Sequence, residues 1–160
     1  MRALVLRFDA PLVSFGSPAV DQRGVVQRYP ALSMLTGLLA NALGWDRRDD
    51  VRTDALQERV RYAARTDRRG LALQDYQTVD LGLPWMLPEF AGWTTRGRIA
   101  ERAGSKDNAT GTHIRYRDYR ADSVHTVALT VTGDQSPTLD DLRDAVQRPA
   151  RPLFIGRKCC

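Results

Sequence analysis

Four stretches of the chain show the alternating pattern of β-strands, with a period of two. They cover residues 4–8, 60–65, 113–119 and 123–132. Residues 71–81 also favour a strand, and a short apolar run at 151–156 adds a last predicted strand. In the stretch 123–132, Val127 and Leu129 fall on one face, with threonine and alanine on the other. In the second stretch Arg59, Arg61 and Arg65 give one face a basic character.

Residues 33–43 show a helical period instead. Their apolar positions follow the spacing i, i+3, i+4, i+7 and are Leu35, Leu38, Leu39 and Ala42. Ser33 is the predicted N-cap, and Gly44 stands where a C′ glycine belongs. Ser33, Gly37, Ala40 and Gly44 form a second stripe of small residues. Glycine inside a helix costs about 1 kcal/mol relative to alanine, so Gly37 predicts close approach by the sheet or by a ligand, the sheet being the commoner reason.

A second helix is predicted at residues 139–147, where Thr138 and Asp141 have the spacing of a capping box. Residues 45–59 carry many charges of both signs. They indicate a solvated connection with a short helix that starts at Thr53.

Residues 11–30 and 82–111 are rich in glycine and proline and predict loops. A loop as long as the second is rare in a small domain unless it is functional or disordered, so we expect a long hairpin insertion at about 80–113. The order strand, helix, strand, strand, helix, strand fits an α+β fold of the ferredoxin-like (RRM-type) class. Its antiparallel sheet carries two helices on one face, and the free face commonly meets RNA. Residues 1–160 are predicted to form one domain.

The length of 160 residues suits one compact domain, and no apolar run approaches the ~20 residues of a membrane span. The first residues indicate a strand and not a signal peptide, so a cytoplasmic location is expected. The two cysteines, Cys159 and Cys160, are adjacent. They predict neither a disulfide framework nor a metal site, and no cofactor is expected.

The net charge of +5 is unevenly distributed. Residues 94–120 hold seven Lys and Arg against three acids, and the stretch 148–160 holds four basic residues without an acid. Residues 121–147 are acidic instead. Concentrated positive charge is typical of a surface that binds a polyanion, the alternative being a solvated basic face without a partner.

Five stretches, in order along nearly the whole chain, resemble the successive motifs of one family. They are "LVLRFDAPLVSFG", "RYPALSMLTGLLANALG", "DYQTV", "IRYRDYRADSVHTVAL" and "RPLFIGRK". The family is CasD, the CRISPR-associated subunits of type I-E Cascade in the repeat-associated (RAMP) superfamily.

This resemblance implies a non-catalytic, RNA-binding subunit that caps the 5′ handle of the CRISPR RNA (crRNA) in antiviral defence. It implies a ferredoxin-like core with a protruding thumb hairpin and contacts with the backbone and large subunits of the ribonucleoprotein complex. Target DNA would be met only through that complex, and no membrane is involved. Family members usually continue past "GRK", so the C-terminal part of the fold is expected to be missing or shortened. Ala31 stands where a threonine often follows the proline, which weakens a role in RNA binding there.

Several features predict where RNA would bind. The N-terminus of the first helix would stabilise an anion over Ser33 and Met34, with Arg23 and Arg28 in the loop before it. Interleaved basic and aromatic residues suit phosphates and splayed bases. The remaining predicted contacts are Tyr76, Arg96, Arg98, Arg102, Lys106, His113, Arg115, Tyr116, Arg117, Arg157 and Lys158. Gly156, beside the last two, would permit close backbone approach. The alternatives are a plain helix cap, a basic loop without RNA and a solvated tail.

Few residues suggest catalysis. His125 is in register with the apolar residues of its strand and is predicted to pack in the core. His113, Tyr116 and Lys106 would suit metal-independent RNA cleavage, in which a base activates a 2′-hydroxyl and a cation stabilises the phosphorane. An endoribonuclease that processes repeat RNA is therefore the alternative function, and a purely protein-binding scaffold is the third.

Overall fold

The structure, a computed structural model, describes residues 2–16, 23–80 and 112–160. Most of the predicted insertion, with Arg96, Arg98, Arg102 and Lys106, lies outside the described residues. The chain divides into two compact units. The first comprises Met1–Ser17, Val26–Leu73 and Tyr119–Cys160, and the second comprises Pro18–Val25 and Gln74–Asp118.

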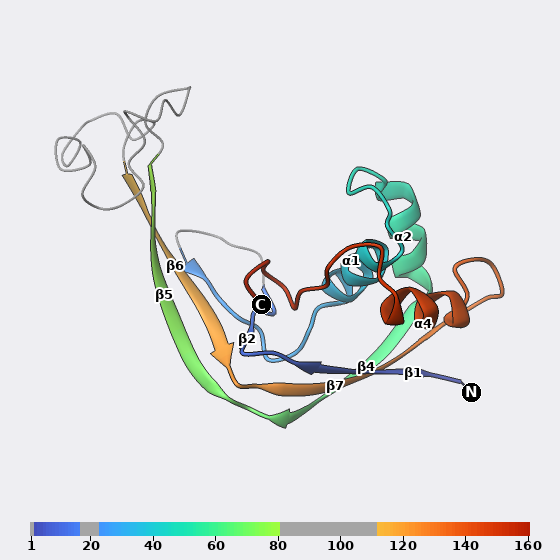
Figure 1. Ribbon diagram of the computed structural model, residues 1–160, viewed down its shortest axis with the longest axis horizontal. Helices are drawn as coiled ribbons and strands as arrows, with labels where there is room; N and C mark the ends of the chain where they lie inside the picture. Colours follow the sequence, from blue (N-terminus) through green and yellow to red (C-terminus); the bar gives the residue numbers. More distant parts are fainter. Residues whose placement is uncertain (1, 17–22, 81–111) are drawn as a thin grey trace. The chain divides into compact units, whose positions relative to one another are not determined.

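The first unit contains an antiparallel three-stranded sheet in the order β1-β7-β4. The strands are β1 (Leu4–Asp9), β4 (Val60–Arg68) and β7 (Val124–Val131). Val127 in the middle strand pairs with Leu6 on one side and Ala64 on the other. All three strands were predicted, and Figure 1 shows α1 and α4 on one face of this sheet.

Four further strands pair in a second sheet. They are β2 (Leu12–Val13), β3 (Arg23–Gly24), β5 (Leu71–Asp80) and β6 (Thr112–Ala121). β5 and β6 pair with each other, which confirms two predicted strands. In the second unit β3 runs parallel to β6, whereas β2 pairs with the end of β6 that belongs to the first unit. The prediction that residues 11–30 form only loop was therefore wrong, because two-residue strands carry too little sequence pattern to be recognised.

Three helices lie in the described part of the chain, in the three regions where helices were predicted, so the fold is α+β. α1 spans Leu32–Ala42, and its N-cap is Ala31, which is extended. The carbonyl of Ala31 accepts hydrogen bonds from the N–H groups of Met34 and Leu35. The prediction of Ser33 as N-cap was wrong, since Ser33 already lies in the first turn. At the other end Gly44 has φ +76° and closes the helix as predicted.

The other two helices begin with capping side chains. α2 (Asp50–Arg59) is capped by Asp49, whose carboxylate accepts from the Arg52 N–H, so the predicted start at Thr53 was wrong. α4 (Leu139–Gln147) begins with the predicted capping box. The Thr138 hydroxyl accepts from the Asp141 N–H, and the Asp141 carboxylate accepts from the Thr138 N–H.

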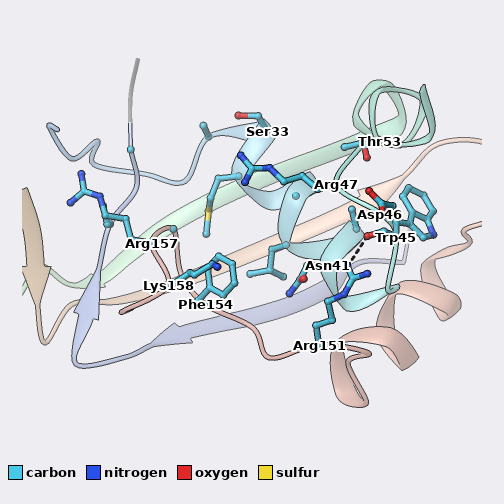
Figure 2. A pocket seen from close by; sticks show the side chains of 18 residues that line it. Ser33, Asn41, Trp45, Asp46, Arg47, Thr53, Arg151, Phe154, Arg157 and Lys158 are labelled. Carbon is cyan, nitrogen blue, oxygen red and sulfur yellow. Dashed lines mark hydrogen bonds between the residues drawn. The ribbon is translucent and has the colours of Figure 1, made fainter. Parts of the chain in front are cut away.

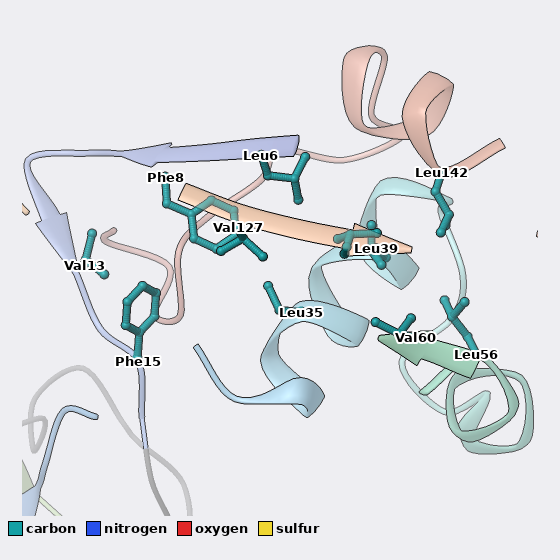
Figure 3. Close-up of a cluster of buried hydrophobic side chains, with 11 residues drawn as sticks. Leu6, Phe8, Val13, Phe15, Leu35, Leu39, Leu56, Val60, Val127 and Leu142 are labelled. Atoms are coloured by element: carbon teal, nitrogen blue, oxygen red, sulfur yellow. The ribbon is translucent and has the colours of Figure 1, made fainter. Parts of the chain in front are cut away.

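The hydrophobic core lies between the three-stranded sheet and the helices (Figure 3). Its buried members are Leu6, Phe8, Val13, Phe15, Leu35, Leu39, Leu56, Val60, Val127, Leu129 and Leu142. Leu35 and Leu39 are from α1, one turn apart, and both are 1% exposed. The apolar stripe predicted for α1 is therefore the face that packs on the sheet.

Residues 151–156 were predicted as a final strand, and this was wrong. The structure shows an irregular segment there, held to the chain after β2 by a 3.1 Å bond from the Ser14 N–H to the Ile155 carbonyl. Short apolar runs are ambiguous in sequence because they also occur in irregular segments that pack on the core.

Arg59 was expected on an exposed basic face, and this was also wrong, since only 8% of the residue is exposed. Its guanidinium donates to the carbonyls of Thr132, Gln135 and Pro137 at 2.9, 2.7 and 3.1 Å. Arg59 therefore satisfies the backbone of the segment between β7 and α4. Arg61 and Arg65, by contrast, are exposed as predicted.

Replacing Arg59 with Met should lower the free energy of unfolding by about 3 kcal/mol, because one buried and two partly buried hydrogen bonds to carbonyls would be lost. Urea denaturation measures this change. The matched control is Arg48→Met, in an exposed position, which should cost less than about 0.5 kcal/mol. Equal stability of the two variants would contradict the assigned role of Arg59.

His125 is a core residue, as predicted, with 3% of its surface exposed. Its ring meets Phe15 edge-on at 4.8 Å, and Nδ1 lies 3.3 Å from the Thr66 hydroxyl. Burial lowers the pKa of His125 below its ordinary 6.5, and the charge of Arg120 acts in the same direction while that of Asp67 opposes it. The folded protein therefore holds this imidazole neutral.

Because the His125 pKa is lower in the folded than in the unfolded state, its contribution to stability is complete above pH 6.5. It is lost as the pH falls through the folded-state pKa. The melting temperature of the wild type should therefore fall more between pH 7 and pH 5 than that of His125→Phe. If the melting temperatures of the two proteins, measured by thermal denaturation, fell equally with pH, this assignment would be contradicted.

Candidate nucleic-acid interface

Four residues predicted to bind RNA line one pocket in the first unit (Figure 2). Ser33 and Met34 are in α1, and Arg157 and Lys158 are in the C-terminal segment. The pocket has a volume of about 730 Å³. The other lining residues are Ser14, Gly16, Ala31, Gly37, Leu38, Ala40, Asn41, Trp45, Asp46, Arg47, Thr53, Arg151, Phe154 and Gly156.

The floor of the pocket is the small-residue stripe of α1. Gly37 is exposed, and a Cβ built on it would meet no atom within 4 Å outside its own helix turns. The expectation that Gly37 packs closely on the sheet was therefore wrong. The sheet contacts the opposite stripe of α1, and Gly37 instead leaves open space above the helix.

One wall is the C-terminal segment, which several hydrogen bonds hold against the end of α1. Asn41 donates its side-chain amide to the Pro152 carbonyl at 2.9 Å. Arg151 donates to the carbonyls of Trp45 and Gly44 at 2.7 and 3.1 Å. These carbonyls lie at the negative end of the helix dipole, where a guanidinium is favoured.

Gly156 brings this wall close to the chain after β2. It has φ +98°, and a Cβ there would clash with the Ser14 carbonyl. Gly156 thus lies at a turn with close backbone approach, and the backbone that approaches is the protein's own at Ser14.

The pocket is predominantly cationic. Arg47, Arg151, Arg157 and Lys158 face it against a single carboxylate, Asp46. Figure 2 shows Arg157 and Lys158 at one end, Asp46 at the other and Arg47 between them. The Arg157 guanidinium also lies 4.7 Å from the centre of the Tyr119 ring, which orients it. Such a lining attracts phosphate groups.

The second unit gathers another set of predicted residues. Tyr76 and Tyr116 meet edge-to-face, with ring centres 5.7 Å apart. The Arg23 guanidinium lies 5.9 Å from the centre of the Tyr116 ring, because β3 pairs with β6 at this position. Tyr76 is 51% exposed. We call Arg23, Tyr76 and Tyr116 the tyrosine platform, a combination that suits base stacking next to a phosphate.

The other predicted residues are not brought into either group. Arg23 was expected in a loop before α1 with Arg28, but it is part of β3. Arg28 stacks on Tyr29 at 5.3 Å and does not line the pocket. Arg115 and Arg117 alternate with Tyr116 along β6. The side chain of His113 lies outside the described residues.

Sequence reasoning missed several lining residues, among them Trp45, Arg47 and Phe154. Arg47 belongs to a run of mixed charge that indicated only solvent exposure. The signal that was available is the glycine in the middle of α1, which marks the open face of the helix.

Among the described residues, no three His, Cys, Asp or Glu side chains are placed to hold a metal ion. Burial raises the pKa of the Cys160 thiol to about 11, so it stays protonated at neutral pH. None of the described helices is long and apolar enough to cross a membrane.

Residues 3–160 match the family described as CRISPR-associated protein (Cas_Cas5). The chain belongs to this Cas5 family. A curated relative, the CRISPR system Cascade subunit CasD of Escherichia coli K12, is 31% identical over 157 residues. The match covers 98% of this chain and 66% of the relative.

Two solved structures, one of a CRISPR complex and one of a Cas protein, have a similar fold. A chain of a CRISPR RNA-guided surveillance complex superposes with a TM-score of 0.70 at 29% identity, covering 99% of this chain and 58% of that chain. The crystal structure of a Cas protein gives 0.58 at 27% identity, covering 98% of this chain and 57% of that one. This Cas5-family chain thus spans less than two thirds of the length of these relatives.

The two glycines of the pocket should respond oppositely to alanine. Gly156→Ala should lower the free energy of unfolding by about 1–3 kcal/mol, because the backbone is held at positive φ against Ser14. Gly37→Ala should raise it by up to about 1 kcal/mol, because alanine favours the helix and meets open space. Urea denaturation of both variants checks these signs, and a destabilised Gly37→Ala protein would contradict the open floor.

Proposed function

We propose that this Cas5-family chain is the RNA-binding subunit of a type I-E CRISPR Cascade surveillance complex and caps the 5′ handle of the crRNA. One observation carries the proposal. Ser33 and Met34 are far in sequence from Arg157 and Lys158, yet all four line one cationic pocket. The family match, the CasD relative and the surveillance-complex fold support the same function.

The chemistry of the two groups suits single-stranded RNA. Phosphates need cations along their path, and unstacked bases need flat surfaces, at roughly 1–3 kcal/mol per stacked base. The pocket supplies Arg47, Arg157 and Lys158, and the tyrosine platform supplies aromatic rings beside Arg23. We therefore assign phosphate binding to the pocket and stacking to both groups.

The proposal includes the ferredoxin-like RAMP arrangement of the core and contacts with the backbone and large subunits in the cytoplasm. It also includes a non-catalytic role. Of the alternative catalytic set, only the Tyr116 side chain is described, and its ring contacts Tyr76 and Arg23. No observation on the described residues favours cleavage of RNA.

A titration of the protein with handle RNA at several salt concentrations tests the proposal. Affinity should fall as salt rises, and the double variant Arg157→Ala/Lys158→Ala should bind more weakly. The slope of log affinity against log salt concentration should be smaller in magnitude by about 1.4 for this variant, since each phosphate contact to a single strand contributes about 0.7. The matched control, Arg61→Ala/Arg65→Ala, removes the same charge from an exposed strand face and should keep the wild-type slope.

Salt-independent affinity would overturn RNA binding as the function, and equal weakening of both double variants would overturn the pocket as its site. Nucleic acid extracted from the purified protein separates this proposal from a pure scaffold, which should yield no short RNA with a shared 5′ segment. Incubation with repeat RNA in chelator should give no product with a defined end.

A further inference from the structure

The shape of the pocket supports a more specific assignment of its ligand. We propose that it takes a single nucleotide of the bound RNA, turned out of the strand, with its base over Gly37 and its phosphate at Arg157 and Lys158. This inference rests on the proposed RNA-binding function and names the unit that the pocket recognises. A volume of about 730 Å³ is in the range of sites for one small ligand.

The floor and sides fit a flat, apolar ring. Gly37 leaves the surface of α1 without a side chain, and a Cβ there would have no neighbour within 4 Å beyond its own helix turns. Met34 and Phe154 line the same pocket as Gly37 and are only partly exposed. A base lying on the helix at Gly37 would thus be covered by apolar atoms, as unstacked RNA bases are in protein sites.

Charge sets the direction of the nucleotide. Arg157 and Lys158 lie at one end of the pocket, and the Asp46 carboxylate lies at the other (Figure 2). Arg151, bonded to the Trp45 carbonyl, lies near Asp46 and offsets its charge, so the excess of positive charge is larger at the first end and a phosphate is favoured there. Arg47, between the two ends, lies where it can accompany the phosphate or stack on the base.

One side chain of the lining offers an acceptor to a ligand. Ser14 lines the pocket but is only 1% exposed, and its Oγ is buried without a hydrogen-bond partner among the described residues, so the Ser14 hydroxyl is not counted as a ligand contact. Asn41 donates its amide to Pro152, which fixes the side chain and leaves Oδ1 as an acceptor. Every nucleotide offers N–H and O–H groups to such acceptors, because the bases and the ribose both carry donors.

A variant with a large side chain at position 37 tests this assignment. Gly37→Leu places a side chain where the base would lie, and leucine favours a helix more than glycine does, so the fold is retained. The variant should bind handle RNA about tenfold more weakly, as expected for the loss of one stacked base. Ala55→Leu, on the exposed face of α2, adds the same side chain away from the pocket and should bind like wild type.

A second readout does not depend on the variants. Adenosine 5′-monophosphate titrated into ¹⁵N-labelled wild-type protein should shift the amide resonances of Gly37 and Lys158 together, whereas adenosine or inorganic phosphate alone should do so only at higher concentration. Wild-type affinity of Gly37→Leu for RNA, with no shift at Gly37, would overturn the nucleotide pocket while salt-dependent RNA binding kept the proposed function intact. A wild-type protein that binds no RNA would overturn both.

Discussion

The packing of α1 on the three-stranded sheet determines what its other side can become. Leu35 and Leu39 fill the space between helix and sheet, and this fixes the rotation of the helix about its axis. The stripe on the far side then faces away from the core, whatever residues it contains. Here it contains Ser33 and Gly37, which are too small to cover the helix backbone. The pocket thus results from ordinary core packing on one side of α1 and from the absence of large side chains on the other.

Regular elements were predictable from sequence because their signals are local. The alternation around Val127 and the capping box at Thr138 each depend on residues within one turn or strand. The start of α1 was misjudged because Ser33 has capping chemistry, while the backbone conformation that makes a cap belongs to Ala31. The burial of Arg59 and the pocket wall at Phe154 could not be read locally, since both depend on segments that are distant in the chain.

The cationic character of the pocket comes from separate segments, each of which is unremarkable by itself. Arg47 lies in a run of mixed charge and Lys158 in a short basic tail. The hydrogen bonds of Arg151 to the end of α1 hold the tail in place, so one arginine serves the architecture while its neighbours remain directed at the pocket. A count of net charge would not have distinguished these roles. The Cas5 family match gives the pocket a biological setting that charge alone does not supply.

The three carbonyl contacts of Arg59 have a consequence for how the molecule opens. This side chain belongs to the last turn of α2, and its acceptors precede α4. The end of α2 cannot move away from the segment before α4 without breaking these bonds. In hydrogen exchange the last turn of α2 and the segment between β7 and α4 should therefore open together. A buried guanidinium thus couples the local opening of two segments that lie 73 to 78 residues apart in the chain.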